Sequence, residues 1–113
     1  MYKQADIGVV KFPFTDGTEF KKRPVLVISN ESVNKTGDYL VIQITSKVHQ
    51  DELSILIEDG DVLSPLPLKS YIRSHKIFTV HYSLILSKIT STNPLFVKTV
   101  SDKISSLISD SNK

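Results

Sequence analysis

The sequence predicts a mainly β domain that ends in one helix, the β+α fold class. Up to Lys88, short runs rich in Val, Ile, Tyr and Phe alternate with Gly, Asn, Asp and Pro, which is the pattern of strands and turns. After Pro94 the apolar residues recur at the spacing of a helix. Many short strands and one helix in 113 residues favour a small, strongly bent antiparallel barrel with the helix packed against it.

The first two expected strands flank a turn and a basic run. Residues 7–12 are short, apolar and β-branched, and Asp16-Gly17 after them is a turn signal. The triplet Lys21-Lys22-Arg23 follows as a basic loop that ends at Pro24. Residues 24–29 are continuously apolar, which is typical of a central strand covered on both faces.

The middle of the chain continues in the same style. Residues 30–38 are polar and without periodicity, which indicates a loop, and Pro65 and Pro67 exclude a helix over 64–68. Residues 83–88 fit either a strand or one helical turn. Four further strands are expected, at residues 39–45, 53–57, 69–73 and 76–82.

The C-terminal helix has a clear start. Thr92 or Asn93 is a good N-cap, and Pro94 suits the first helical position. The polar tail 109–113 is expected to fray. The apolar stripe of this helix consists of Val97, Val100, Ile104, Leu107 and Ile108.

Length and composition predict one cytoplasmic domain over residues 1–113. The hydrophobic share of 40% is that of an ordinary globular protein. No apolar run approaches the roughly 18–20 residues that span a bilayer, and the first residues lack the apolar stretch of a signal peptide. The chain has no cysteine, so it can form no disulfide and no thiolate metal site. A membrane protein is therefore not expected.

The net charge of +2 conceals an uneven distribution. Five of the 12 acids lie between residues 51 and 61, where there is no base. Outside that stretch 14 bases stand against 7 acids. The sequence is therefore compatible with a basic face that attracts a polyanion, although charge alone equally allows an evenly solvated surface.

One stretch of the sequence carries a family resemblance. Residues 12–29 read Phe-Pro-Phe-Thr-Asp-Gly-Thr-Glu-Phe-Lys-Lys-Arg-Pro-Val-Leu-Val-Ile-Ser, preceded by Asp6-Ile7-Gly8-Val9-Val10 and followed by Ile44-Thr45-Ser46. In this order and spacing, over roughly residues 5–110, the chain resembles the MazF/PemK toxin endoribonucleases of type II toxin–antitoxin systems. One departure is Ala5, where the family usually has Gly; this position bears on a turn.

The resemblance implies an SH3-like barrel decorated with helices, which works as a homodimer. It also implies that Arg23 is the catalytic arginine and Thr45 the catalytic threonine. From the residues alone, Arg23 could equally form a surface ion pair, and Thr45 with Ser46 would fit a plain turn. Their chemistry suits the implied roles, since a guanidinium donates two parallel hydrogen bonds to phosphate and a hydroxyl can add a third.

Further residues are candidates for RNA binding. Lys21 and Lys22 are expected to contact backbone phosphates, although a solvated charge run is an equal alternative. Phe14 or Phe20 could stack on an extruded base. Ser46 lies beside Thr45. Ser70 and Arg73 occupy a strand that resembles a family strand, and they either line the RNA groove or close the barrel.

No cofactor and no metal site are expected. The sequence has no Cys-x-x-Cys, no His-Glu-x-x-His and no Gly-rich phosphate loop. His49, His75 and His81 do not have the spacing of metal ligands, and residues 51–61 fit a solvated acidic edge. RNA cleavage can proceed without a metal, because the 2′-hydroxyl beside each phosphate is a built-in nucleophile.

The leading hypothesis is therefore a metal-independent, sequence-specific endoribonuclease toxin that cuts single-stranded mRNA. The resemblance implies a cognate antitoxin as partner, whose disordered and often acidic tail covers the basic groove. Two alternatives stay open: a gyrase-inhibiting toxin of the same fold, and a non-catalytic RNA-binding barrel. The intact Lys-Lys-Arg-Pro and Ile-Thr-Ser motifs disfavour the gyrase inhibitor, which does not depend on the Arg and Thr pair.

Overall fold

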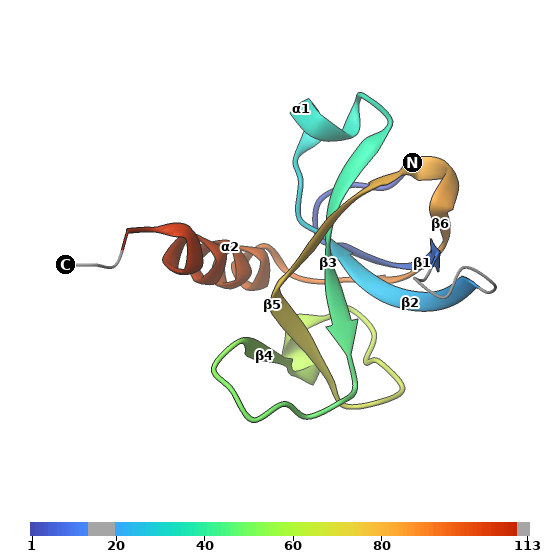
Figure 1. Cartoon of the computed structure of the whole chain (residues 1–113). Helices are drawn as coiled ribbons and strands as arrows, with labels where there is room; N and C mark the ends of the chain where they lie inside the picture. Colours follow the sequence, from blue (N-terminus) through green and yellow to red (C-terminus); the bar gives the residue numbers. More distant parts are fainter. Residues whose placement is uncertain (14–19, 111–113) are drawn as a thin grey trace.

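Six antiparallel strands form one curved sheet in the order β4-β5-β3-β2-β1-β6 (Figure 1). The computed structural model describes residues 1–13 and 20–110, without the side chains of Pro13 and Phe20. The strands are β1 (Asp6–Pro13), β2 (Phe20–Val27), β3 (Asp38–Thr45), β4 (Ser54–Ile57), β5 (Ser70–His81) and β6 (Ile85–Ser91). The helical elements are α1 (Glu31–Asn34), η1 (Asp59–Asp61), η2 (Tyr82–Leu84) and α2 (Pro94–Ile108). The prediction of a mainly β fold with one C-terminal helix is confirmed.

The sheet is bent but does not close into a full barrel. In the described part of the chain, the end strands β4 and β6 share no ladder. They are linked indirectly, because the segment after η1 reaches the end of β6. Val62 forms a single bridge with Thr92, and the Leu63 N–H donates to the Ser91 carbonyl at 2.9 Å. The expected barrel is thus an open, strongly curved sheet whose two ends meet at this bridge.

The hydrophobic core consists of two clusters, one on each face of the central strands. Neighbouring residues of β2 divide between them, because side chains alternate along a strand. Leu26 belongs to the cluster under α2, while Val25 and Val27 belong to the other. The prediction of a central strand covered on both faces is confirmed at these residues.

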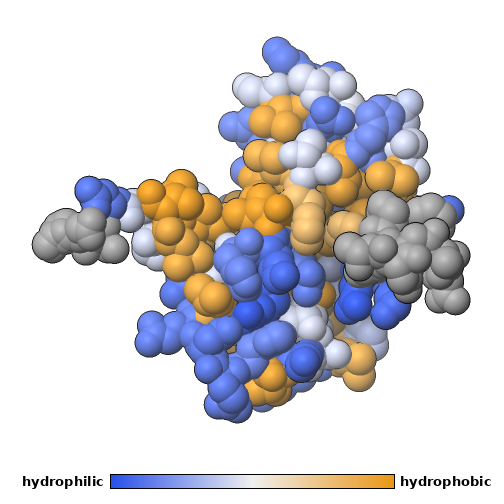
Figure 2. All heavy atoms as spheres, in the orientation of Figure 1, coloured by the Kyte–Doolittle hydropathy of each residue, from blue (hydrophilic) through white to orange (hydrophobic). Residues whose placement is uncertain are grey.

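Helix α2 begins as the sequence predicts and packs through its first half. The Asn93 Oδ1 atom accepts the Phe96 N–H at 2.8 Å, and Pro94 occupies the first helical position. Phe96 and Val100 are buried against the sheet. Beyond them the helix leaves the sheet (Figure 1), and Ile108 is 78% exposed. Only the first part of the predicted apolar stripe is therefore covered within one chain, and hydrophobic side chains gather on the surface over α2 (Figure 2).

The basic triplet lies inside a strand, not in a loop before it. Lys21, Lys22 and Arg23 belong to β2, where they pair with Phe12, Lys11 and Val10 of β1. Pro24 does not begin the strand either, since it lies in its middle, opposite Val9. The apolar composition of 25–28 indicated only the half of β2 that lies between the two strands β1 and β3.

Two other elements differ from the expectation. The two strands expected at 69–73 and 76–82 are one strand, β5, with a wide bulge. Ile42 of β3 pairs with Ile77, whereas Ile44 pairs with Ile72, so the four residues 73–76 of β5 stand opposite the single residue Gln43. Residues 30–38, expected as a loop, contain the short helix α1, which Asn30 caps by accepting the Ser32 N–H at 3.0 Å.

The turn before β1 is formed by a residue other than glycine. Ala5 has φ of 83°, in the left-handed region, which costs a residue with a Cβ about 1–2 kcal/mol. The turn is held on both sides, since the Ala5 N–H donates to the Val27 carbonyl at 2.9 Å and its carbonyl accepts the Thr92 N–H at 2.8 Å. The sequence departs from the family pattern at this strained position.

No helix in residues 1–13 and 20–110 is long and apolar enough to cross a membrane. The longest, α2, has 15 residues.

Candidate functional site

A pocket opens where strands β2 and β3 stop pairing. The two strands are paired only from Val25 to Val27, opposite Val41 to Gln43. Pro24 has no N–H to continue this ladder. The pocket has a volume of about 230 Å³. It is lined by Lys22, Arg23, Pro24, Ile44, Thr45, Ser46, Leu66, Pro67, Leu68, Ser70 and Ile89.

Arg23 lines the β2 side of this pocket. It precedes Pro24 in the middle of β2 and is partly buried. Pairing of β2 with β1 fixes its backbone, because Arg23 lies opposite Val10. A partly desolvated guanidinium on a rigid strand can hold an anionic group such as phosphate in two parallel hydrogen bonds.

Thr45 and Ser46 lie on the β3 side. Thr45 ends β3, and its Oγ1 atom accepts the Lys47 N–H at 3.1 Å. This bond orients the hydroxyl and leaves its proton available, since no acceptor takes that proton in the described part of the chain. Ser46 is exposed beside it. The site therefore joins one guanidinium with hydroxyl groups that can donate to the same anion.

Ser70 forms part of the pocket wall through another bond. It begins β5, is buried, and its hydroxyl donates to the Leu68 carbonyl at 2.8 Å. That bond ties the start of β5 to the segment 66–68, which bends at Pro67 and Leu68 and lines the same pocket. The proton of Ser70 is used within the protein, so its hydroxyl oxygen faces a ligand only as an acceptor.

Only some of the other predicted RNA-binding residues lie at this pocket. Lys22 lines the pocket, whereas Lys21 is exposed on β2 and does not line it. Phe14 lies outside the described residues, and so does the side chain of Phe20. The structure thus brings together Lys22, Arg23, Thr45, Ser46 and Ser70 of the nine candidates that the sequence offered.

Arg73 is engaged elsewhere. Its Nη1 and Nη2 atoms donate to the two carboxylate oxygens of Asp51 at 2.9 and 3.0 Å, and Nη1 also donates to Ser54 Oγ at 2.9 Å. The residue is only 5% exposed and does not line the pocket. Arg73 was expected either to line the RNA groove or to close the barrel, and its place away from this pocket does not support the first. Arg73 lies in the bulge of β5. Its bonds to Asp51 and Ser54 fix the loop between β3 and β4.

Sequence reasoning missed the apolar part of the pocket. Leu66, Pro67 and Leu68 form one wall, and Ile44 and Ile89 complete the apolar lining. Leu68 is 64% exposed, so it offers apolar surface that a flat ring can contact. The signal for this wall was present in Pro65-Leu66-Pro67, since prolines at alternate positions keep a segment extended.

In the described residues, no group of three or more His, Asp or Glu side chains is arranged to hold a metal ion.

Comparison with known protein families identifies the family of the chain. The profile of the PemK-like, MazF-like toxins of type II toxin–antitoxin systems matches residues 3–108. The chain belongs to this family. No curated protein matches this MazF-like chain in sequence.

Solved structures of other MazF-like toxins share its fold. A MazE–MazF complex from Deinococcus radiodurans superposes with a TM-score of 0.79 at 18% identity, covering 97% of each chain. A mycobacterial endoribonuclease in complex with its cognate antitoxin has a TM-score of 0.76 at 14% identity, covering 94% of this chain and 93% of the other. The Mycobacterium tuberculosis toxin MazF-mt6 has a TM-score of 0.70 at 18% identity, covering 89% and 93%. At these identities the likeness establishes the fold.

The Arg73–Asp51 pair gives this MazF-like chain a testable pH dependence. The hydrogen bonds from Arg73, with that from the Leu53 N–H, lower the pKa of Asp51 to about 2 from an ordinary 3.8. A carboxyl whose pKa falls on folding stabilises the protein above its ordinary pKa and loses this contribution as the pH drops toward the folded value.

We therefore expect thermal unfolding of the wild type to shift to lower temperature between about pH 4 and pH 2. Asp51→Asn should start from a lower melting temperature at pH 7 and show a smaller acid shift. Differential scanning fluorimetry across this range measures both. Parallel pH curves for the wild type and Asp51→Asn would show that the pair makes no such contribution.

Proposed function

We propose that this chain is an endoribonuclease toxin that cuts single-stranded RNA, with mRNA as its cellular target, in the cytoplasm. The observation that carries the proposal is that Arg23 of β2 lines one pocket with Thr45, at the end of β3, and Ser46, although Arg23 and Thr45 stand 22 positions apart in the sequence. Membership in the MazF-like toxin family supports it, and so do related structures described as endoribonucleases.

The chemistry proposed for the pocket is attack by the RNA's own 2′-hydroxyl. A bond forms between the 2′-oxygen and phosphorus as the 2′-hydroxyl gives up its proton to solvent, and the bond from phosphorus to the 5′-oxygen breaks as that oxygen takes up a proton. The products are a 5′-hydroxyl end and a 2′,3′-cyclic phosphate, or a 3′-phosphate once water opens the ring. Arg23 donates two hydrogen bonds to the non-bridging oxygens, whose negative charge grows in the transition state. Thr45 donates a third, and Lys22 neutralises a neighbouring phosphate.

Arg23 acts here by charge stabilisation and not as the base. The pKa of a guanidinium lies above about 12, so proton abstraction by Arg23 would be costly near neutral pH. The nucleophile belongs to the substrate, and the proposed reaction therefore requires no metal ion. Cleavage in excess EDTA is the corresponding expectation.

We further propose that an antitoxin covers the same cations. Related structures are described as complexes of MazF with MazE or of a mycobacterial endoribonuclease with its cognate antitoxin. An acidic segment laid over Lys22 and Arg23 would compete directly with RNA phosphates for them. Excess antitoxin should then displace a labelled RNA strand, and a complex that holds both at once would contradict shared use of the pocket.

A homodimer is proposed as the working form. Strand β6 is the last of the sheet, no strand of the described residues forms a ladder on its outer edge, and Leu86 and Ile89 on it are 46% and 41% exposed. Edge strands with apolar side chains are usually covered, and twofold dimers are the commonest way to do so. Light scattering at micromolar concentration should give twice the chain mass of 12.7 kDa. A fully active monomer would contradict this proposal.

The test of the function is incubation of the purified protein with mixed single-stranded RNA in excess EDTA. Discrete cleavage products with 5′-hydroxyl ends support the nuclease. Binding without cleavage would instead support the non-catalytic RNA-binding alternative. Neither binding nor cleavage, together with inhibition of DNA gyrase, would support the gyrase-inhibiting alternative.

A further inference from the structure

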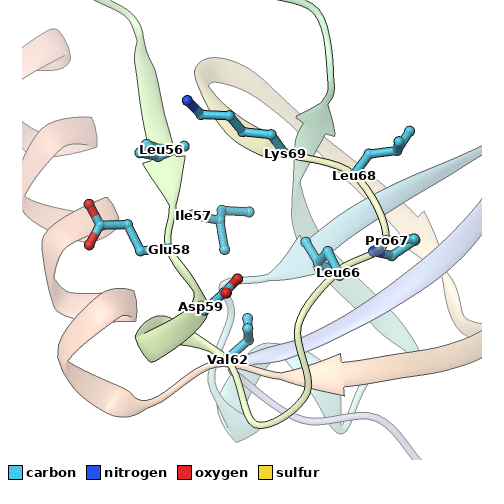
Figure 3. A pocket seen from close by; sticks show the side chains of 9 residues that line it. All are labelled: Leu56, Ile57, Glu58, Asp59, Val62, Leu66, Pro67, Leu68 and Lys69. Atoms are coloured by element: carbon cyan, nitrogen blue, oxygen red, sulfur yellow. The ribbon is translucent and has the colours of Figure 1, made fainter.

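A second pocket lies next to the first. Its volume is about 390 Å³, which is within the range of small-molecule sites. It shares the wall Leu66-Pro67-Leu68 with the pocket that contains Arg23 and Thr45, and it lies on the other side of that wall. It is lined by Leu56, Ile57, Glu58, Asp59, Val62, Leu66, Pro67, Leu68 and Lys69 (Figure 3).

The lining of this second pocket combines apolar side chains with the charged residues Glu58, Asp59 and Lys69. The side chains of Ile57, Val62 and Leu66 point toward one another across it (Figure 3). Asp59, at the start of η1, points its carboxylate toward the same centre (Figure 3). Within residues 1–13 and 20–110 this carboxylate has no hydrogen bond and no ion pair. Two acceptor oxygens of this exposed residue thus face the pocket with no partner from the described protein.

Such a lining suits a ligand with flat apolar faces and N–H groups at one edge. Nucleobases have this form, and single-stranded RNA readers bind splayed-out bases through stacking and through their Watson–Crick edges. Guanine presents two adjacent N–H donors on that edge, N1–H and the 2-amino group. A carboxylate can accept both, whereas uracil, cytosine and adenine offer at most one N–H position there beside repelling acceptors.

The second pocket lies where an RNA strand bound at the first pocket can reach it. Ser70 and Ile57 are direct partners across β5 and β4, yet Ser70 lines the first pocket and Ile57 the second. Lys69 lies on the second pocket's rim, across from Asp59 (Figure 3), and can offset the carboxylate's repulsion of a phosphate. A nucleotide beside the cut bond can therefore place its base beyond the 66–68 wall.

We propose that the second pocket binds a guanine base of the RNA substrate and that Asp59 determines this preference. The inference rests on the proposed RNA-cleaving function and adds to it one base of the recognised sequence.

The first experiment compares cleavage of a randomised single-stranded RNA pool by the wild type, Asp59→Asn and Glu52→Gln. The wild type should favour guanine at one position close to the cut, by about tenfold or more. Asp59→Asn should lose that preference and keep the others, because an amide cannot accept both N–H groups. Glu52→Gln is the matched control, since this exposed carboxylate lies in the same acidic stretch and lines neither pocket. It should retain the wild-type profile.

The second experiment replaces that guanine by inosine, which lacks the 2-amino group. Binding to a strand whose cleavage-site ribose is 2′-deoxy is measured by fluorescence anisotropy, so that it does not depend on turnover. The wild type should bind the inosine strand several-fold more weakly, and Asp59→Asn should bind both strands alike.

Several results would overturn the proposal. One is a wild-type profile without guanine at any position, and another is an Asp59→Asn profile identical to the wild type's. A third is weaker antitoxin binding by Asp59→Asn with an unchanged base profile, because it would assign the pocket to a protein partner. Guanine-dependent binding without any cleavage would uphold the pocket and overturn the nuclease function instead.

Discussion

Arg23→Ala is expected to reduce RNA cleavage at least ~10²-fold while the protein stays folded, because it removes charge stabilisation from the transferring phosphate. Arg23 is only partly buried and lies outside both core clusters, so its loss should leave the sheet intact. Single-turnover rates on a short single-stranded RNA measure the effect, and circular dichroism checks the fold.

Two neighbouring substitutions make this result specific. Lys21→Ala removes one charge from the same strand but outside the pocket, so it should affect RNA affinity far more than the rate of the bound complex. Thr45→Val keeps the shape of the side chain and removes the hydroxyl, and it should slow the same step as Arg23→Ala. Near-normal single-turnover rates in Arg23→Ala would remove this residue from the mechanism.

Replacing the ribose before the cut bond by its 2′-deoxy form is expected to abolish cleavage. The proposed nucleophile is the 2′-hydroxyl itself, so no change in the protein can compensate for its loss. A labelled oligonucleotide with one deoxy position, incubated with the protein for many wild-type half-lives, measures the residual rate.

The control is the same oligonucleotide with the deoxy sugar one position further along, which should still be cut. The 5′ ends of the products should also be hydroxyls, which accept a labelled phosphate from a kinase without prior phosphatase treatment. Cleavage at the deoxy position would mean that water attacks the phosphate, and it would overturn the proposed reaction.

The sequence predicted the fold class because the relevant signals are local. The capping of α2 by Asn93 and Pro94 depends on a few adjacent residues, and the two-sided burial of 25–27 follows from their continuous apolar character. The helix α1 was missed because four residues are too short to show a period. The bulge of β5 was read as a break between strands, since Ser74 and His75 interrupt the apolar pattern without ending the strand.

The candidate site was predictable in part. Arg23 and Thr45 could be selected through the family's motifs, but nothing in their sequence separation indicates that they share a pocket. Arg73 illustrates the opposite case. A cation on a strand is read as a surface charge, whereas here Arg73 is buried and is neutralised by the exposed Asp51, 22 positions earlier. Such pairing depends on how a loop folds back, which a local pattern does not contain.

The early end of pairing between β2 and β3 has a consequence for how this protein can change. The opening beside Arg23 exists because a proline interrupts the backbone ladder, so its presence depends little on which side chains surround it. The wall at 66–68 belongs to a connecting segment outside the sheet, and replacing its residues leaves every strand pairing untouched. Under the proposed function, this wall, which both pockets share, can therefore vary while Arg23 and the strand pairing around it stay in place, so that evolution or an engineer can redirect the cut without rebuilding the sheet.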